Sequence, residues 1–536
     1  MNLPALSRFV FLALCFALLW LSVDMTHGGF WGPVIIAIPA FLILLGLWDL
    51  TQTHHSVLRN YPVIGHMRWM VEFIRPEIRQ YLLEGEDEAT PYSRAQRSLV
   101  YRRAKGVSSD HPFGTLMDVY APDYEFIQHS ARPIDEADPE SFRITIGNNQ
   151  CEQPYSASIF NISAMSFGSL SANAIRALNK GAKMGNFYHD TGEGSISAYH
   201  REAGGDLVWE LGSGYFGCRD ADGRFNPDKF ARQACEPQVK MIEIKLSQGA
   251  KPGHGGILPA EKVTPEIAAT RGVPLGEDCI SPARHSAFST PLELMEFISD
   301  LRRLSLGKPV GFKLCIGHPW EFMAIVKAML ASRITPDFIV VDGGEGGTGA
   351  APVEFSDHIG TPLREGLLFV HNTLVGAGLR DRIRIGAAGR IVSAFDIARV
   401  LAIGADWANA ARGYMFALGC IQSLSCHTNT CPTGVATQDK LRQRALVVPD
   451  KAERVRRYHA RTVRVLADML AAGGIAHPDE LKPHHVFRRV TDTQVLPLAD
   501  VLVFLKPGSL LDGSAADPYY TTNWHRARAE SFDPVM

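Results

Sequence analysis

Two long apolar runs open the chain, and the hydrophobic pattern changes after them. Residues 9–23 are apolar apart from Ser22, and residues 31–48 are interrupted only by glycine and proline. Apolar runs of about this length are typical of membrane-spanning helices. The link between them, residues 24–29, is short. We therefore expect residues 1–50 to form a transmembrane helical hairpin; the alternative is a hydrophobic hairpin that packs on the rest of the protein.

The positive charges indicate how such a hairpin would be oriented. The link has no Lys or Arg, whereas Arg8 precedes the first run and four arginines follow the second between residues 59 and 79. Short loops rich in Lys and Arg stay on the cytoplasmic side of a membrane. We therefore expect both ends of the hairpin, and the chain beyond it, at the cytoplasmic face of the membrane, in a reducing compartment.

Residues 51–140 mix short helices and loops and are expected to wrap a catalytic domain.

Beyond residue 158, short apolar runs alternate with helical periodicity. The expected strands are residues 159–162, 186–189, 241–246, 310–314, 338–341, 383–385 and 407–410, with helical patterns between them, for example at 291–304, 321–331 and 394–403. This alternation predicts an α/β fold with a parallel sheet, either doubly wound or closed into a (β/α)8 TIM barrel. No G-x-G-x-x-G motif opens a helix after the first strand, which disfavours the dinucleotide-binding form.

The composition adds further limits. The 536 residues are enough for one large domain with additional segments, and residues 451–472 have an amphipathic helical pattern within the C-terminal region 447–536. Lys and Arg number 54 against 56 Asp and Glu, so the net charge of −2 gives no reason to expect nucleic acid as a partner. The nine cysteines are scattered and do not resemble a disulfide framework.

Three of these cysteines fall together in the loop 419–432. Cys420, Cys426 and Cys431 have the spacing C-x5-C-x4-C, among Gly, Thr and Asn residues, and Pro432 follows the last. Buried core cysteines are one interpretation. A zinc site is another, but zinc usually takes four ligands in C-x2-4-C pairs, and His427 would be a strained fourth. Iron–sulfur clusters are held by thiolates, and three thiolates in one loop suit a 3Fe–4S cluster.

The cysteine loop and four other motifs, in the same order, resemble the FMN-binding synthase domain of the glutamate synthases. The resemblance spans roughly residues 142–446. The motifs before the cysteine loop are Ser163-Ala164-Met165-Ser166-Phe167-Gly168, Thr191-Gly192-Glu193-Gly194, Lys245-x-x-Gln248-Gly249-Ala250-Lys251-Pro252-Gly253 and Glu345-Gly346-Gly347-Thr348-Gly349-Ala350. The chain is identified as a membrane-anchored short form of this family. The resemblance implies a (β/α)8 barrel over residues 141–446, an FMN, and a 3Fe–4S cluster held by Cys420, Cys426 and Cys431.

Several residues are expected to hold the FMN. By the resemblance, the backbone of Ala164, Met165 and Ser166 would lie against the flavin ring. Glycine-rich turns after late strands are natural places for the phosphate; they are Gly346, Gly347 and Thr348, then Gly386, Gly389 and Arg390, and then Arg412 and Gly413. Lys313 lies inside an apolar strand, where a lysine needs a partner or a role. It is expected to point into the barrel and stabilise the anionic reduced flavin; the alternative is a lysine that reaches the barrel rim.

Two lysines and an amide come at the end of the expected strand 241–246. Groups such as those of Lys245, Gln248 and Lys251 can hold a dicarboxylate. In the family, the matching residues, with Glu193 and Ser213, surround the 2-oxoglutarate site and the loop that controls it. Without the resemblance, a lysine pair in a loop is more often solvated surface.

The sequence departs from the family pattern in three places. Where the family usually has Lys-Pro-Gly-Glu-Gly-Gly-Gln, this chain has His254 for the acid and Ile257 for the final amide. Asp190 stands where the family has Asn, and Ser195 where it has Gly. Large glutamate synthases begin with a catalytic cysteine in a glutaminase domain, whereas this chain begins with Met1 and Asn2. We therefore expect it to have no glutaminase activity of its own.

Together these features predict an oxidoreductase that acts on CH–NH2 groups. The leading hypothesis is reductive amination of 2-oxoglutarate to glutamate by hydride transfer from FMN. Electrons would reach the cluster from a donor such as ferredoxin or a reductase subunit, and ammonia would be free or supplied by a separate subunit. The alternatives are the same cofactors acting on another 2-oxo or 2-amino acid, and a non-catalytic electron-transfer subunit.

Overall fold

The computed structural model describes residues 3–25, 32–86, 88, 91–110 and 112–535. The chain forms two compact units, Met1–Glu88 and Ala89–Met536. The boundary falls inside residues 51–140, which the sequence pattern had suggested to be a single wrapping region.

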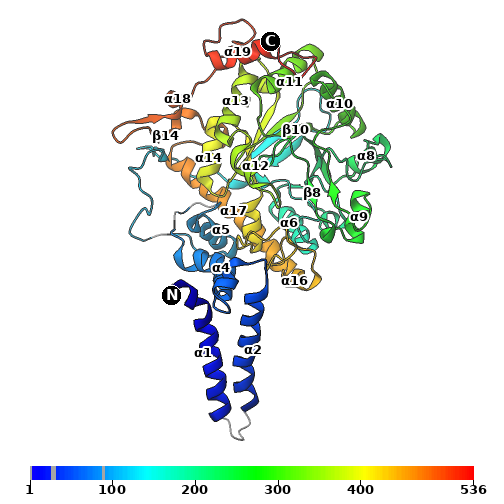
Figure 1. The fold of residues 1–536 in the computed structure, drawn as a ribbon. Helices are drawn as coiled ribbons and strands as arrows, with labels where there is room; N and C mark the ends of the chain where they lie inside the picture. Colours follow the sequence, from blue (N-terminus) through cyan, green and yellow to red (C-terminus); the bar gives the residue numbers. More distant parts are fainter. Residues whose placement is uncertain (1–2, 26–31, 87, 89–90, 111, 536) are drawn as a thin grey trace. The chain divides into compact units, whose positions relative to one another are not determined.

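The first unit is a pair of long helices followed by shorter ones. α1 (Leu3–Met25) and α2 (Gly32–Thr51) lie side by side, and α3 (Ser56–Asn60), α4 (His66–Ile78) and the π-helical turn η1 (Arg79–Leu83) follow (Figure 1). Both apolar runs are therefore helical, as predicted, while residues 26–31 of the link lie outside the described residues. Within the described part of the chain, α2 is the one helix both long and apolar enough to cross a membrane, and the apolar stretch Ala13–Asp24 is shorter.

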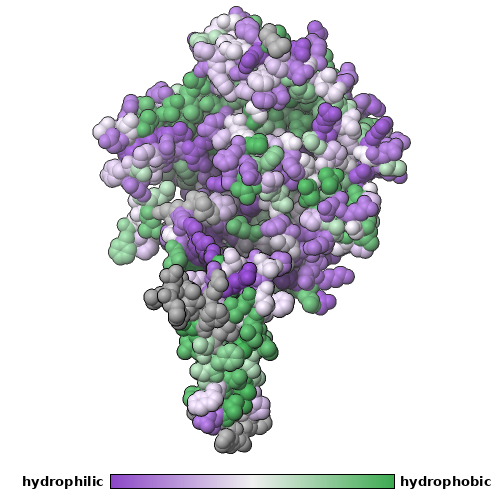
Figure 2. All heavy atoms as spheres, in the orientation of Figure 1, coloured by the Kyte–Doolittle hydropathy of each residue, from purple (hydrophilic) through white to green (hydrophobic). Residues whose placement is uncertain are grey.

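The two long helices expose most of their apolar side chains. Trp20 and Trp48 are 72% and 68% exposed, and the visible face of the hairpin is mainly hydrophobic (Figure 2). By contrast, Asp49 at the end of α2 is fully buried, accepts a hydrogen bond from Val63 N at 2.8 Å and lies 2.8 Å from His66 Nε2. Asp49 thus joins the end of α2 to the segment that leads into α4.

The second unit is built on a closed barrel of eight parallel strands. In barrel order they are β4 (Phe160–Ile162), β5 (His189–Asp190), β6 (Leu207–Leu211), β7 (Val239–Lys245), β10 (Val310–Leu314), β11 (Phe338–Asp342), β12 (Arg384–Ala388) and β13 (Trp407–Ala410). β13 pairs with β4, which closes the barrel. The predicted (β/α)8 barrel is confirmed, and every strand except β6 overlaps a predicted apolar run.

The sequence pattern missed β6 because its run Leu-Val-Trp-Glu-Leu is interrupted by an acid, Glu210. The barrel interior accommodates this carboxylate because Lys313 of β10 pairs with it. β12 also runs farther than expected, since Ala387 and Ala388 still pair with β11.

Helices follow the strands and cover the outside of the barrel (Figure 1). They include α6 (Ala172–Gly185), α8 (Pro227–Ala234), α10 (Pro291–Leu304), α11 (Pro319–Ser332), α13 (Leu363–Gly376), α14 (Ala394–Ile403) and α15 (Arg412–Leu418). α10 and α14 have the predicted bounds. Both begin with a capping box, Thr290 with Glu293 and Ser393 with Asp396, which satisfies the first N–H groups of each helix.

The long helix α17 (Val448–Ala472) packs on α6 and on α5 (Arg94–Lys105), in agreement with its amphipathic pattern. Gly181 allows the close approach of α6, because a Cβ there would lie 2.5 Å from Val455. The remaining named elements are β1 (Glu125–Ile127), β2 (Arg143–Ile146), β3 (Tyr155–Ser158), α7 (Ala198–Arg201), β8 (Ile257–Leu258), α9 (Pro265–Arg271), β9 (Cys279–Ile280), α12 (Val353–His358), α16 (Lys440–Arg444), β14 (Val486–Arg489), β15 (Val495–Pro497), α18 (Leu498–Val501) and α19 (Pro518–Arg526).

Candidate active site

A cavity opens at the C-terminal ends of the barrel strands, where barrel enzymes bind their ligands. The predicted residues that line it together are Ala164, Met165, Ser166, Glu193, Lys245, Gln248, Lys251, Lys313, Gly346, Gly347, Thr348, Gly389, Arg390, Arg412 and Cys426. Five other predicted residues do not line it, namely Ser213, Gly386, Gly413, Cys420 and Cys431.

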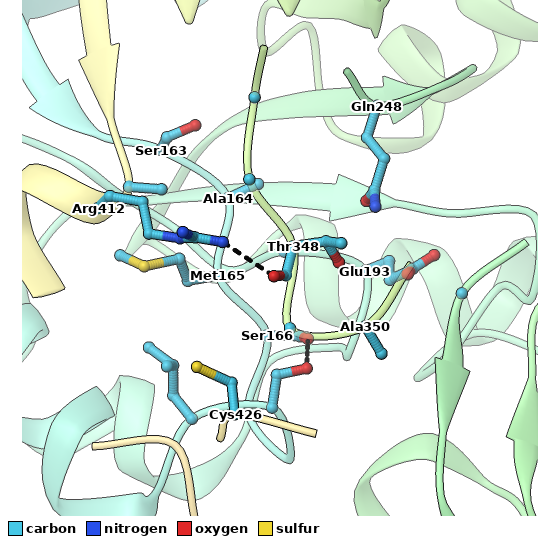
Figure 3. A pocket seen from close by; sticks show the side chains of 18 of the residues that line it. Ser163, Ala164, Met165, Ser166, Glu193, Gln248, Thr348, Ala350, Arg412 and Cys426 are labelled. Carbon is cyan, nitrogen blue, oxygen red and sulfur yellow. Dashed lines mark hydrogen bonds between the residues drawn. The ribbon is translucent and has the colours of Figure 1, made fainter. Parts of the chain in front are cut away.

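One wall is the loop after β4 (Figure 3). Ser163 N donates to Ala410 O at 3.1 Å, which ties this loop to the end of β13. The loop after β5 approaches it closely, because a Cβ on Gly192 would lie 2.6 Å from Ser166 N. Gly192 also has a φ of 63°, which favours glycine. The wall is therefore made of backbone, small side chains and Met165, and a planar ligand can lie against it.

The glycine-rich loops after β11 and β13 are held together by Arg412. Its Nη2 donates to Thr348 O at 2.8 Å (Figure 3). A Cβ on Gly347 would lie 2.4 Å from this guanidinium, so a side chain there would displace Arg412 from its present position. Arg390, after β12, lines the same cavity. Two guanidinium groups beside glycine-rich backbone form a site for an anion such as a phosphate.

Gly386 and Gly413 are needed for packing instead. A Cβ on Gly386, within β12, would lie 2.5 Å from the Trp407 ring, and one on Gly413, within α15, would lie 2.6 Å from Tyr458 Oη. In the sequence, a glycine that admits a bulky neighbour looks the same as a glycine that faces a ligand, so the pattern could not separate them.

The lysines predicted to bind substrate do converge with Glu193. Lys245 Nζ lies 3.0 Å from Glu193 Oε1. Although burial raises the pKa of Glu193, Lys245 and the nearby cations Arg271 and Lys251 lower it to about 2. Burial lowers the pKa of Lys251, while Glu193 opposes this shift. The three cations and Gln248 line one side of the cavity, and with one carboxylate among them they favour an anionic ligand.

The other residues of this region differ in their placement. Ser213 Oγ donates to Pro282 O, outside the cavity lining. His254 contacts the Phe355 ring and does not line the cavity either. Ile257 does line it: it begins β8, pairs with Ile280 of β9, and is 41% exposed.

The floor of the cavity carries charged side chains that the sequence predicted only in part. Lys313 points into the barrel, as expected, and lines the cavity. Its Nζ bonds to Glu210 and lies 3.5 Å from Glu243 Oε2. These acids come from β6 and β7, far from Lys313 in the chain, so no sequence spacing signals them.

The three clustered cysteines are free thiols close to one another. Burial raises the pKa of Cys420 to about 11 and that of Cys426 as well, and the charges of neighbouring thiols add to both shifts. A metal ion needs several His, Cys, Asp or Glu ligand atoms close together. Among the described residues, only Asp190, Glu210 and Glu243 bring three such atoms within 4.8 Å of one another.

Hydrogen bonds from two sides hold the cysteine loop beside the cavity. Lys262 is buried and donates to Cys426 O at 2.7 Å and to Ala436 O at 3.1 Å. Tyr101 of α5 donates to Cys420 O at 2.6 Å. Cys426 consequently faces the cavity, near Met165 (Figure 3).

The barrel, the cationic cavity at the C-terminal ends of its strands and the adjoining thiols define a barrel enzyme with its candidate site at the strand ends. Residues 121–476 match the family model described as a conserved region in glutamate synthase. The chain belongs to the glutamate synthase family, and it is an oxidoreductase.

Two relatives illustrate how much of the chain is shared. The glutamate synthase large subunit-like protein YerD of Bacillus subtilis (strain 168) is 38% identical over 513 residues, which cover 87% of this chain and 97% of YerD. The archaeal glutamate synthase (NADPH) of Methanocaldococcus jannaschii is 34% identical over 322 residues, 60% of each chain. The match thus covers little more than half of the length of these archaeal-type relatives. Among solved structures, a flavocytochrome b2 variant with sulfite bound has a TM-score of 0.40 and 13% identity, covering 88% of this chain and 95% of that one.

Proposed function

We propose that this protein is an FMN- and iron–sulfur-dependent oxidoreductase that converts 2-oxoglutarate and ammonia to glutamate. One observation carries the proposal. A single cavity brings together the cationic residues Lys245 and Lys251, the anion site at Thr348 and Arg412, and Cys426 of the cysteine loop. Membership of the glutamate synthase family supports it.

The cavity has the groups that an FMN needs. Residues 164–166 offer a backbone wall for the ring, and Arg390, Arg412 and residues 346–348 offer donors for the phosphate. Lys313 would place a fixed cation below the ring, where it favours the anionic reduced form. When bound, the FMN supplies the hydride, and a 3Fe–4S cluster supplies electrons one at a time.

Cys420, Cys426 and Cys431 would hold the cluster. Thiols bind iron as thiolates, so burial that raises the pKa of Cys420 and Cys426 must be offset by the metal and by nearby cations. Lys262 is such a cation: it is buried, and its charge acts on Cys426 and Cys431.

The substrate side matches a dicarboxylate in charge. Lys245, Lys251 and Arg271 supply three positive charges, and Glu193 with its low pKa removes one. The remaining two positive charges match the two negative charges of 2-oxoglutarate. Lys245 and Lys251 would bind its carboxylates, and Glu193 would hold Lys245 in position through their 3.0 Å ion pair.

A second substrate is favoured by Ile257. This apolar side chain lines the cavity where the family has an amide, and it suits a 2-oxo or 2-amino acid with a less polar tail. A non-catalytic electron-transfer subunit is a weaker alternative, because it would have no use for the cationic side of the cavity.

We also propose that α1 and α2 anchor the protein to the cytoplasmic membrane, with the barrel on the cytoplasmic side. Their exposed apolar side chains support this, and Trp20 and Trp48 suit the two membrane–water interfaces. The electron donor would be a ferredoxin or a reductase subunit that approaches the exposed cysteine loop, where Leu424 is 65% exposed. Ammonia would come from solution or from a separate subunit.

The decisive experiment follows the colour of the bound flavin. The purified full chain, reduced without oxygen, is mixed with 2-oxoglutarate, with ammonia, with both, or with less polar 2-oxo acids plus ammonia. Rapid flavin oxidation only with 2-oxoglutarate and ammonia together, with glutamate formed, supports the proposal. Oxidation by another 2-oxo acid supports the second substrate, and protein that binds no flavin contradicts both.

A further inference from the structure

Four charged side chains meet below the floor of the cavity, each from a different strand. Asp190 lies on β5, Glu210 on β6, Glu243 on β7 and Lys313 on β10. All four are at least 96% buried. One carboxyl oxygen from each acid lies within 4.8 Å of the others, and Glu210 and Glu243 stand directly opposite each other in the parallel register. We call these four side chains the carboxyl cluster.

The charges of the carboxyl cluster do not balance if every group is ionised. Three carboxylates would face one ammonium, that of Lys313, which bonds to Glu210 and lies 3.5 Å from Glu243. Glu243 Oε2, the atom that Lys313 approaches at 3.5 Å, accepts no hydrogen bond. Burying uncompensated charge is very costly. At least one of these carboxyls must therefore hold a proton.

The neighbouring strands supply no other free cation among the described residues. Lys245, at the end of β7, is paired with Glu193. β11 adds a further acid, Asp342, whose Oδ2 accepts from Gly249 N at 2.8 Å. Tyr188 next to β5 is neutral, because burial raises its pKa well above the usual value, and its hydroxyl bonds to Asn409 Oδ1 of β13 at 2.7 Å. Every strand that faces the cluster thus adds either negative charge or none.

The proton resides on the pair formed by Glu243 and Asp190. Burial and then the Asp190 charge raise the pKa of Glu243 well above its usual value. Burial, followed by the Glu210 charge, raises the pKa of Asp190 to about 7. The hydrogen bond between these two side chains raises the pKa of Glu243 and lowers that of Asp190. The two acids therefore share one proton, which Glu243 holds when Asp190 is ionised.

A metal ion is the obvious alternative occupant of three carboxylates, but the structure does not favour it. The Lys313 ammonium already bonds to Glu210 and lies 3.5 Å from Glu243. A divalent cation in the same place would meet this fixed positive charge at short range. The carboxyl cluster is therefore built to hold protons together with its own lysine.

We propose that the carboxyl cluster stores a proton and delivers it to the cavity through Glu210. The proposal rests on the proposed function. Glu210 and Lys313 line the cavity, whereas Asp190 and Glu243 do not. A proton that reaches the cavity from Glu243 therefore passes by way of Glu210, its neighbour across β6 and β7.

The chemistry of the proposed reaction needs such a store. A hydride delivered to the substrate carries two electrons and one proton, but electrons that come from an iron–sulfur cluster arrive without protons. One proton per turnover must therefore be supplied at the cavity floor. Glu193 cannot supply it, because its pKa of about 2 leaves it ionised. Glu243 releases the proton, and Glu210 transfers it to the bound flavin as the flavin takes up two electrons. Water then returns one proton to the carboxyl cluster before the next turnover.

The first test is infrared spectroscopy of the full chain at pH 8, with and without bound flavin. A protonated carboxylic acid has a carbonyl band that shifts in D2O. We expect this band in the wild type and its loss in Glu243→Gln, in which an amide of the same shape replaces a neutral carboxyl. Glu193→Gln and Asp342→Asn are the matched controls and should keep the band. Absence of the band in the wild type, or its loss in Asp342→Asn rather than in Glu243→Gln, would overturn the proposal.

The second test times proton uptake against flavin reduction in a stopped-flow instrument with a pH-indicator dye at pH 8. In the wild type, flavin reduction by dithionite should precede proton uptake from solution. In Glu243→Gln the two should coincide, and reduction should slow about a hundredfold or more, at the low end of what general acids contribute. Simultaneous uptake in the wild type contradicts storage. A chain that binds no flavin contradicts the proposed function alone, since the infrared band of the flavin-free protein still tests the cluster.

Discussion

Single side chains decide what the cavity binds, and Ile257 is the clearest case. It lines the cavity without any polar group to offer, next to the cationic side formed by Lys245 and Lys251. A buried hydrogen-bond partner left unsatisfied costs about 1–3 kcal/mol, which is roughly a tenfold to hundredfold change in affinity.

We expect Ile257→Gln to improve the affinity for 2-oxoglutarate by roughly tenfold to hundredfold, the range given above. The measurement is the KM for 2-oxoglutarate with ammonia saturating. Ile280→Gln is the matched control, because Ile280 pairs with Ile257 across β8 and β9 but does not line the cavity. Lys251→Ala should abolish turnover with any 2-oxo acid. Tight binding of 2-oxoglutarate by the wild type, with no change in Ile257→Gln, would instead indicate an unaltered glutamate synthase pocket.

The thiols of Cys420, Cys426 and Cys431 predict how much iron the purified protein contains. We expect Cys426→Ser to lose iron and keep flavin, because the cavity wall at residues 164–166 and the anion site at Arg412 do not involve this sulfur. Purified wild type should carry about three irons per chain, as a 3Fe–4S cluster requires. Cys235→Ser is the control, since Cys235 lies outside the cavity lining. Zinc without iron in the wild type would refute the cluster.

At the scale of elements, the hairpin is not the only apolar surface of the first unit. α4 and η1 expose Met70, Phe73 and Leu82 at 58%, 82% and 77%, with Arg75 and Arg79 close to them in sequence. An amphipathic helix with basic and large apolar residues is typical of one that lies at a membrane surface.

This predicts a difference between two truncations. Removal of residues 1–50 should leave a flavin-loaded protein that still binds liposomes with anionic lipids, and removal of residues 1–88 should abolish that binding. The measurement is co-sedimentation at low and high salt. Release of the full-length protein from membranes by high salt without detergent would show that α1 and α2 are not an anchor.

At the scale of the whole molecule, buried histidines determine how the free energy of unfolding changes as the pH falls. Burial lowers the pKa of His189 and His459 to about 3 and that of His285 to about 4. In the unfolded chain these side chains bind protons below about pH 6.5, whereas in the folded chain they stay neutral. Unfolding therefore takes up protons, and stability is lost as the pH falls from about 6.5 toward these lowered values.

Each such histidine costs about 1.4 kcal/mol of stability per pH unit within that window. We expect the unfolding free energy of the barrel unit, residues 89–536, to fall steeply between pH 6.5 and pH 4.5, measured by urea titration. His459→Gln should reduce the slope of unfolding free energy against pH by the contribution of one proton, about 1.4 kcal/mol per pH unit. Ser158 Oγ, which lies 2.9 Å from His459 Nε2, can still form a hydrogen bond with the new amide. An unfolding free energy independent of pH in this range would contradict the burial of neutral histidines.

The periodicity of the sequence predicted an α/β fold with a parallel sheet, and the family resemblance selected the barrel and most of the cavity residues. Strand periodicity identifies runs such as β10 and β11 because they are apolar and bounded by turns. The motifs around Lys245, Thr348 and Cys426 are local, so their residues stay together in any fold that keeps each loop at a strand end.

Which residues act together across strands became visible only in the folded protein. Glu210 made β6 look unlike a strand, and its partner Lys313 comes about a hundred residues later in the chain. Likewise, Gly386 and Gly413 proved to admit Trp407 and Tyr458 rather than a ligand. The physical reason is that charge pairing and close packing depend on distances set by strand register, and register is a property of the closed barrel rather than of any single segment.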